Sequence, residues 1–174
     1  MTFAYHGKYI QIQEKLIEGR LWEKAFFRSG IVIFPITSQK KILLVKEKRP
    51  HETPEFRIKP VTGIFEPEFN VADNAIREME EEIGKTTHPK NIHLFLELKS
   101  TGTVNNQQYF VYATNWSNHK IPNPDGEDSI QEILEVSFEE LEDMTWSQKI
   151  PWGQATLGIF KLLELNRKNK IQNS

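Results

Sequence analysis

The sequence predicts an α/β domain in which a mixed sheet packs against helices. Three observations predict it: short apolar strand candidates before residue 46, one strongly amphipathic helix near the middle, and further strand candidates followed by a terminal helix. Strands and helices do not alternate regularly, so a layered mixed sheet is favoured over repeated βαβ units. A length of 174 residues fits one domain, which we expect to span residues 1–174.

The N-terminal part of the chain is predicted to be rich in strands. Residues 9–13 and 16–27 contain alternating and aromatic stretches, interrupted at Gly19, which predict short strands or a hairpin. Residues 31–36 and 41–45 are apolar throughout most of their length and predict two buried strands joined by a short polar turn.

Residues 70–83 give the clearest helix prediction in the chain. Asn70 can cap the helix, with Asp73 three residues later as its reciprocal partner. Gly84 supplies a stop signal, since glycine readily adopts the left-handed conformation that ends a helix. One face repeats apolar side chains at helical spacing: Ala72, Ala75, Ile76, Met79 and Ile83.

The C-terminal half is predicted to contain a strand pair, a further strand and two helices. The pair comprises residues 92–98 and 108–114, across a polar loop at 101–107. An acidic, turn-rich loop at 122–129 precedes the remaining elements, which are a strand at 130–137, a short helix at 138–146 and an amphipathic helix at 153–166. Residues 167–174 are expected to form a polar tail.

Composition excludes several classes of site. The chain contains no cysteine, which rules out disulfides, thiolate zinc sites and cysteine nucleophiles. A net charge of −2, with no basic run, gives no reason to expect nucleic-acid or membrane binding. The N-terminus lacks the apolar core of a signal peptide and no apolar stretch is long enough to cross a bilayer, so we expect a cytoplasmic protein.

Acidic side chains cluster on the central helix. Glu78, Glu81 and Glu82 stand at i, i+3 and i+4 and share one face, roughly opposite the apolar stripe. Like charges at this spacing repel, and a hard divalent cation such as Mg²⁺ would remove that repulsion. The alternative from these residues alone is a solvated acidic face, with Arg77 neutralising Glu81 one turn later.

Residues 63–85, GIFEPEFNVADNAIREMEEEIGK, resemble the Nudix box, G-x5-E-x7-R-E-U-x-E-E-x-G-U, where U is a bulky aliphatic residue. Seven of the nine specified positions match: Gly63, Arg77, Glu78, Met79, Glu81, Glu82 and Gly84. Two positions depart from the pattern, since Phe69 replaces the first glutamate and Lys85 the last aliphatic residue. Glu66 or Glu68 is close enough in sequence to supply the missing carboxylate.

The resemblance implies a Nudix-type α/β/α sandwich and a metal-dependent hydrolase. It implies that Mg²⁺, with Mn²⁺ as a substitute, is held by Glu78, Glu81, Glu82 and the carbonyl of Thr62. Arg77 would orient the glutamates through charge-assisted hydrogen bonds. The metal would neutralise a diphosphate and lower the pKa of a bound water, which then attacks phosphorus.

Segments outside the box resemble the branch of the family that includes ADP-ribose pyrophosphatase. Residues 22–28 resemble the segment of that branch that reaches towards the partner subunit's substrate. Residues 47–49 resemble the segment that ends the second core strand, and residues 60–63 resemble the lead into the box. The resemblance implies a homodimer built with residues 1–30 as N-terminal dimerisation strands. Arg28 and Arg49 are candidates to bind phosphate, since a guanidinium can pair bidentately with phosphate oxygens. The substrate-binding candidates are Trp22, Arg28, Arg49 and Ile64.

In that branch a carboxylate on the loop before the closing strand acts as a base or metal partner. Glu127 and Asp128 occupy this loop, with Glu132 a more distant candidate, and local comparison does not separate the first two. The alternative for this acidic segment is an ordinary solvated turn. The catalytic candidates are therefore Arg77, Glu81, Glu127 and Asp128. The predicted activity is cleavage of a nucleoside diphosphate sugar to a nucleoside monophosphate and a sugar phosphate. The alternatives are hydrolysis of dinucleotides, nucleoside triphosphates or RNA 5′ ends, or a degenerate domain that binds nucleotides without turnover.

Overall fold

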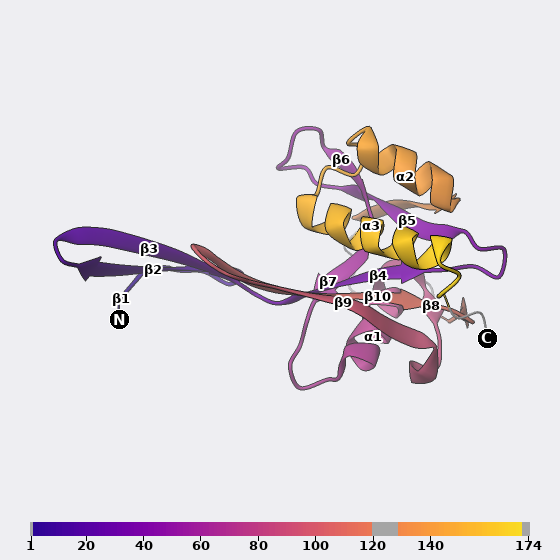
Figure 1. Ribbon diagram of the computed structural model, residues 1–174, viewed down its shortest axis with the longest axis horizontal. Coiled ribbons are helices and arrows are strands. Elements are labelled where there is room, and N and C mark those ends of the chain that lie inside the picture. The colour runs from indigo at the N-terminus through magenta and orange to yellow at the C-terminus, as the bar shows by residue number, and fades with distance from the viewer. Residues whose placement is uncertain (1, 120–128, 172–174) are drawn as a thin grey trace.

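The protein, seen here in a computed structural model that describes residues 2–119 and 129–171, consists of a layered body and a long projecting arm (Figure 1). The arm is an antiparallel ribbon of three strands: β1 (Thr2–His6), β2 (Ile10–Ile17) and β3 (Arg20–Phe27). The two longer strands confirm the expected N-terminal hairpin, which turns at Glu18 and Gly19 with φ of 52° and 76°. β1 lies within residues 1–30, which were expected to form strands, although its bounds were not predicted.

The arm continues directly into the main sheet of the body. Four strands form this part of the sheet: β4 (Gly30–Pro35), β7 (Val61–Ile64), β9 (Ile92–Thr101) and β10 (Val104–Ala113). The start of β10 pairs in parallel with β3, and the rest of β10 pairs in parallel with β4. β9 and β7 pair antiparallel with β10 and β4, which makes the sheet mixed. The base of the arm is therefore fixed to the body by strand pairing.

A second sheet and the helices complete the layers. The sheet contains β12 (Ile130–Val136), β5 (Ile42–Lys48) and β6 (Phe56–Lys59), all antiparallel. Helix α1 (Val71–Ile83) lies on one side of the strands, whereas α2 (Phe138–Trp146) and α3 (Gly153–Arg167) lie on the other (Figure 1). Shorter elements are β8 (Lys85–Thr86), the 3₁₀ turn η1 (Pro89–Asn91) and β11 (Ser117–Asn118). This is the predicted α/β/α arrangement.

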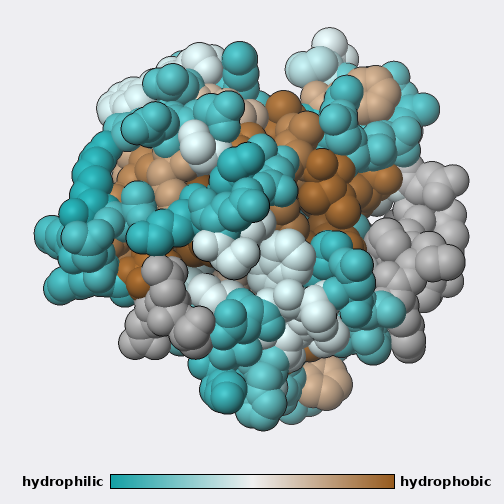
Figure 2. Space-filling model, turned by 90° about the vertical axis from the view of Figure 1, so that its right-hand side faces the viewer, coloured by the Kyte–Doolittle hydropathy of each residue, from teal (hydrophilic) through white to brown (hydrophobic). Residues whose placement is uncertain are grey.

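Alternation along β4 explains the sandwich. Val32 and Phe34 belong to the core shared with α3, whereas Ile31 and Ile33 belong to the core shared with α1. Successive side chains of a strand point to opposite faces, so an entirely apolar strand such as β4 requires cover on both faces. At the end of the molecule away from the arm, polar residues cover most of the surface and apolar residues are visible between them (Figure 2).

The helix predictions agree closely with the structure. The Asn70 side chain accepts a hydrogen bond from the Asp73 N–H, and Gly84 adopts the left-handed conformation with φ 62°. Helix α2 begins at a capping box formed by Ser137 and Glu140. None of the helices in the described ranges has the length and apolar character needed to span a membrane.

The predicted polar loop at 101–107 is wrong. β9 extends to Thr101 and β10 begins at Val104, so two residues form the turn. Polar residues here are compatible with strands because the ladder with β9 and the pairing with β3 satisfy their backbone groups. Strands β6 and β7 were also missed, since Pro60 separates two runs of only four residues each.

Candidate catalytic and metal-binding site

Helix α1 and the loop before it are held together by a buried amide. The Asn74 side chain, fully buried, accepts a hydrogen bond from the Glu66 N–H at 2.9 Å. Its amide nitrogen donates to the carbonyls of Glu66, Phe69 and Asn70 at 2.9–3.2 Å. Because one buried amide bonds four backbone groups of residues 66–70, it fixes the course of the loop. The loop in turn sets where Glu66 lies relative to the helix.

Arg77 organises the first two carboxylates of the helix. Its Nη2 donates to Glu78 Oε1 at 2.6 Å, and its Nη1 donates to both oxygens of Glu81 at 3.1 and 3.2 Å. A third hydrogen bond, at 3.3 Å, reaches the Ile64 carbonyl on β7. The guanidinium thus joins α1 to the strand that precedes it, through charge-assisted bonds of fixed geometry.

Glu66 is the carboxylate that lies beside Arg77, where the first glutamate of the box is missing from the sequence. Phe69, which replaces the box glutamate, is 45% exposed, and Glu68 is also exposed. A carboxylate oxygen of Glu66 lies 3.9 Å from Arg77 Nε, a buried atom without a hydrogen-bond partner among the described residues. Of the two glutamates considered as replacements, Glu66 is therefore the one beside the arginine.

Glu78 is buried against the backbone of β7. A Cβ atom at Gly63 would overlap the Glu78 carboxylate, so the close approach requires glycine. Burial raises the pKa of Glu78 to about 7, and the neighbouring charges of Glu81 and Glu82 act in the same direction while Arg77 opposes them. The ionised form of Glu78 is therefore disfavoured in these surroundings.

This raised pKa predicts a stability that falls with pH when no metal is present. The folded protein keeps the Glu78 proton up to about pH 7, whereas the unfolded chain releases it near its ordinary value. Stability from this group is full below the unfolded pKa and is lost as pH rises through the folded pKa, by about 3 kcal/mol. Urea unfolding in chelator between pH 4.5 and 8 should show this fall, and Glu78→Gln should flatten it. A slope unchanged in Glu78→Gln would contradict the assignment.

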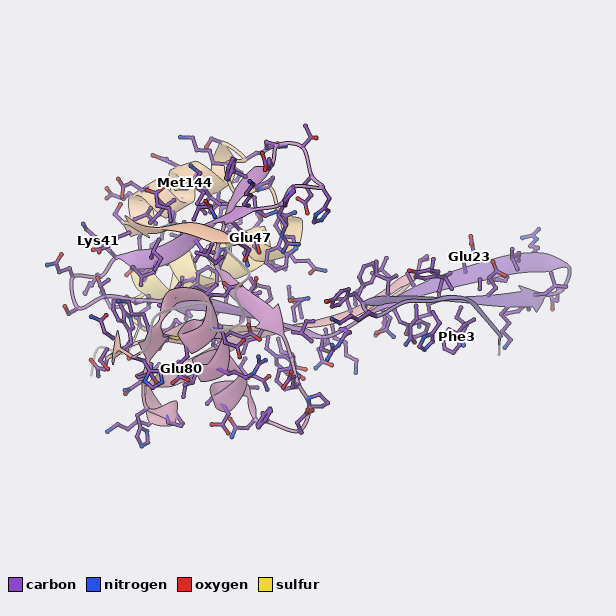
Figure 3. All side chains as sticks on the ribbon, turned by 180° about the vertical axis from the view of Figure 1, so that it is seen from behind. Phe3, Glu23, Lys41, Glu47, Glu80 and Met144 are labelled. Atoms are coloured by element: carbon purple, nitrogen blue, oxygen red, sulfur yellow. The ribbon has the colours of Figure 1, made fainter. Side chains whose placement is uncertain are left out.

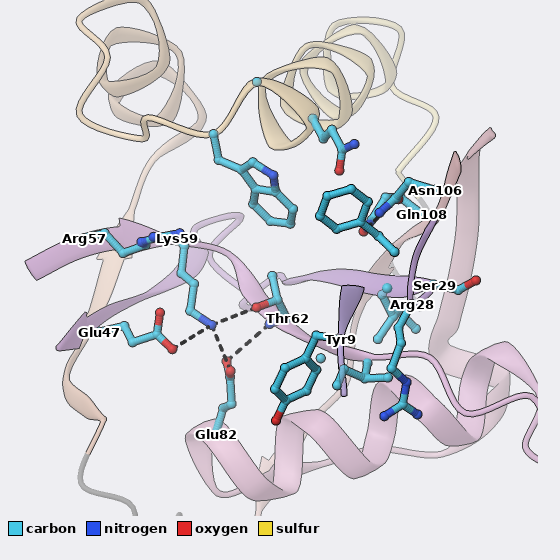
Figure 4. Close-up of a pocket in the computed structure, with 18 of the residues that line it drawn as sticks. Tyr9, Arg28, Ser29, Glu47, Arg57, Lys59, Thr62, Glu82, Asn106 and Gln108 are labelled. Atoms are coloured by element: carbon cyan, nitrogen blue, oxygen red, sulfur yellow. Dashed lines mark hydrogen bonds and ion pairs between the residues drawn. The ribbon is translucent and has the colours of Figure 1, made fainter. Parts of the chain in front are cut away.

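Glu82 is hydrogen-bonded by residues of β6 and β7. Its Oε2 accepts a hydrogen bond from the Thr62 N–H at 3.2 Å, and its Oε1 lies 2.9 Å from the ammonium of Lys59. Burial raises the pKa of Glu82 and the contact with Lys59 opposes that rise. Lys59 also donates to the Thr62 hydroxyl at 2.7 Å and lies 3.5 Å from Glu47 (Figure 4). Glu47 in turn accepts a bond from Arg49 at 2.7 Å.

The residues fit a divalent cation in their chemistry. Glu78, Glu81 and Glu82 offer carboxylate oxygens on one helix, beside the Thr62 backbone, and oxygen ligands suit Mg²⁺. Burial is the main cause of the raised pKa of Glu78, and the charges of Glu81 and Glu82 raise it further, so a cation beside these residues would favour the ionised carboxylate. Within residues 2–119 and 129–171, no three carboxylate, imidazole or thiolate side chains are arranged together around one metal position. Arg77 and Lys59 hold the carboxylates instead.

A pocket of about 850 Å³ opens beside this cluster (Figure 4). The base of the arm forms one wall with Tyr9, Phe27 and Arg28. The opposite part of its lining comes from α3 and its N-terminal end, with Trp152, Gly153 and Gln154. Its remaining polar lining residues are Ser29, Glu47, Arg49, Arg57, Lys59, Thr62, Glu82, Asn106 and Gln108.

The pocket brings together several of the predicted site residues. Arg28, Arg49, Thr62, Ile64 and Glu82 line it. The cluster of Arg77, Glu78 and Glu81 is joined to it through the Ile64 carbonyl and Gly63. Trp22 is on β3 of the arm, 58% exposed, and is not among the described residues that line the pocket of its own chain. The loop predictions Glu127 and Asp128 lie outside the described residues.

Sequence reasoning did not identify several polar residues of the pocket. Lys59 and Glu47 reach the pocket from strands of the second sheet, and they are 4% and 6% exposed. Charged side chains are rarely buried to this extent unless they are paired, so these two belong to the polar network of the site. Asn106 and Gln108 are buried on β10, where Gln108 Nε2 donates to Asn106 Oδ1 at 2.9 Å. Alternating polar residues in a strand were the available signal, but Asn106 was assigned to the predicted loop at 101–107, and Gln108, predicted to begin the strand at 108–114, was not recognised as a pocket residue.

Comparison with known proteins identifies the family. The model of the NUDIX domain matches residues 26–155, which is most of the chain. A solved structure described as an ADP compounds hydrolase superposes with a TM-score of 0.80 over 97% of this chain and 93% of that one. Its sequence is 15% identical, so this likeness concerns the fold. No curated protein matches the chain. Together with the box on α1, the match over residues 26–155 shows that the chain belongs to the Nudix family of hydrolases, enzymes that generally use divalent metal ions.

Proposed function

We propose that the protein hydrolyses a nucleoside diphosphate sugar of the ADP-ribose type, with Mg²⁺ as its cofactor, to a nucleoside monophosphate and a sugar phosphate. One observation carries the proposal. Cationic side chains and a carboxylate of α1 line a single pocket large enough for such a substrate, in which Arg28 and Arg49 share the space with Glu82.

The cationic side chains suit the diphosphate. Arg28 comes from the end of β3, while Arg49 and Arg57 come from the β5–β6 region. Glu47 accepts a hydrogen bond from Arg49 Nε, which restrains the guanidinium and leaves its two terminal nitrogens outside that contact. Planar guanidinium groups bind phosphate oxygens in pairs, which orients the substrate as well as attracting it.

On the acidic side, the ligands proposed for Mg²⁺ are Glu78, Glu81, Glu82 and the Thr62 carbonyl. The chemistry that a bound divalent ion supplies is neutralisation of charge at the diphosphate and activation of water. Arg77 holds Glu78 and Glu81 at defined positions through its two terminal nitrogens. We also propose that Glu127 or Asp128 acts as the loop carboxylate, in keeping with the order of elements along the chain.

The remaining lining suits a base and a sugar. Tyr9, Phe27 and Trp152 provide aromatic faces, and the amides of Asn106 and Gln108 provide both donors and acceptors. The structure that this chain resembles is described as acting on ADP compounds, a class to which ADP-ribose belongs. This likeness supports the choice of an ADP-containing substrate.

The proposal includes a homodimer formed through the arm. Large apolar side chains are exposed along it, with Leu16 and Leu21 at 69% and 60%. The other exposed apolar residues of the arm are Phe3, Tyr5, Tyr9, Ile10, Ile17, Trp22 and Phe27. Figure 3 shows that Phe3 and Glu23 on this arm are far from Glu47 and Glu80 in the body. An extended ribbon with so much exposed apolar surface is typical of an interface, and a second copy would cover it.

Charges placed near the tip of the arm should break this dimer. Leu16 and Leu21 face each other across β2 and β3, so Leu16→Asp together with Leu21→Asp puts two charges at one cross-strand position. We expect a change from dimer to monomer, measured by light scattering after gel filtration. Leu157→Asp changes an exposed leucine of α3 and should leave the dimer intact. A wild-type protein that is already monomeric would contradict the proposed dimer.

A panel of substrates tests the proposed activity. It contains ADP-ribose, other nucleoside diphosphate sugars, dinucleotides, nucleoside triphosphates and a capped RNA, each with Mg²⁺, and products are separated by chromatography. We expect the highest kcat/KM for ADP-ribose or a related nucleotide sugar. Preference for triphosphates or capped RNA by about tenfold or more, equal to about 1.4 kcal/mol in transition-state binding, would overturn the proposed substrate class.

A further inference from the structure

The residue that stands out in the candidate metal site is a buried lysine. Lys59 is the last residue of β6 and is 4% exposed. Lysine is rarely buried to this extent without partners, because its ammonium loses its hydration. Its position at the end of a short strand, directly before Pro60, places the ammonium on the floor of the pocket rather than in solvent (Figure 4).

The ammonium is surrounded by oxygen atoms. It donates to the Thr62 hydroxyl at 2.7 Å, lies 2.9 Å from Glu82 Oε1 and lies 3.5 Å from Glu47 Oε1. Carboxylate and hydroxyl oxygens are also the donors that a hard divalent cation takes. One of them, Glu82, is a proposed metal ligand, and its second oxygen already accepts a hydrogen bond from the Thr62 N–H. Both oxygens of Glu82 are therefore engaged from the strand side.

We propose that Lys59 is a positioning residue whose ammonium competes with divalent metal ions for Glu82. The inference rests on the proposed metal-dependent function and names a further determinant of it. Two cations that require the same carboxylate oxygen repel each other, so a divalent ion binds Glu82 only against the positive charge of Lys59. The lysine keeps Glu82 paired when no metal is present, and it lowers the affinity of the site for metal.

Metal binding without substrate tests this inference. Mn²⁺ is titrated into the full-length protein and free Mn²⁺ is followed by electron paramagnetic resonance. Lys59→Gln and Lys59→Met remove the charge and are expected to bind Mn²⁺ at least about tenfold more tightly than the wild type, a change of about 1.4 kcal/mol. Lys59→Arg keeps the charge and is expected to retain the wild-type affinity. Lys48→Gln removes an exposed lysine paired with Glu55 at 3.1 Å and should also retain it.

Melting temperature gives a second readout. Mn²⁺ should raise the melting temperature of Lys59→Gln more than that of the wild type, since ligand binding to the folded state adds stability in proportion to the logarithm of its affinity. The wild type, Lys59→Gln and Lys59→Met could instead bind Mn²⁺ with equal affinity while the wild type shows metal-dependent turnover. That result would overturn the inference about Lys59 and leave the proposed function standing. Absence of Mn²⁺ binding in all the proteins would overturn the proposed metal site itself.

Discussion

Replacing Glu82 by glutamine is expected to lower kcat by about 10³-fold or more while the fold persists. Loss of a single electrostatic group at a reacting centre already costs roughly 10²–10³ in rate, and Glu82 is proposed to serve as a metal ligand. Glutamine has nearly the same shape and its amide oxygen can still accept the hydrogen bond from the Thr62 N–H. The variant is assayed under saturating substrate with Mg²⁺, and circular dichroism checks that the helix and sheet remain.

Glu80→Gln is the matched control for this change. Glu80 lies on the same helix, two residues earlier, and is paired with His119 at 3.6 Å rather than with the residues of the pocket. Its charge is removed in the same way, so a general effect of lowering the negative charge of α1 would appear in both variants. We expect kcat to stay within about twofold of the wild type in Glu80→Gln. A Glu82→Gln variant as active as Glu80→Gln would contradict the assignment of Glu82.

Gly63→Ala is expected to reduce kcat by about 10²-fold or more with little change in stability. The added Cβ would occupy the space of the Glu78 carboxylate, and the flexible end of that side chain can move away more easily than the backbone of β7. Displacement of a reacting group by about 1 Å can cost roughly 10²-fold. The free energy of unfolding should change by less than about 1 kcal/mol, since alanine in place of glycine restricts the unfolded chain.

Gly102→Ala provides the control for Gly63→Ala. A Cβ at Gly102, in the turn between β9 and β10, would meet no atom within 4 Å. Its turnover and stability should match those of the wild type in the same assays. If Gly63→Ala kept full turnover, the buried position of Glu78 against β7 would not be required for catalysis. A large loss of stability in Gly63→Ala would show instead that the backbone had moved.

Local signals predicted the fold where they were strong. The cap at Asn70, the apolar stripe and Gly84 defined α1 almost to the residue, because each acts within a few positions of the helix end. The apolar run of β4 predicted a strand buried on both faces. Strands β6 and β7 have four residues each and depend on pairing with β5 and β4, which the local sequence does not reveal.

In the candidate site, too, contacts within one helix could be predicted from the sequence, whereas contacts between strands could not. Arg77 and the three glutamates lie within one helix, so their spacing determined that they would be close together. The contacts of Lys59 with Glu82 and Glu47 join residues separated by 23 positions or placed on different strands, and they exist only after the sheets have assembled. The arm was predicted as strands, but its projection from the body follows from the switch of β10 between β3 and β4.

The most direct test of the proposed function is the release of AMP from ADP-ribose in Mg²⁺ and in chelator. The proposal predicts steady release of AMP and ribose 5-phosphate with Mg²⁺, loss of that release in chelator, and recovery when Mg²⁺ is restored. The proposal is contradicted if ADP-ribose raises the melting temperature of the protein yet no product forms with Mg²⁺ or Mn²⁺. The pocket would then bind the nucleotide without hydrolysing it, and the carboxylates of α1 would not form the proposed catalytic centre.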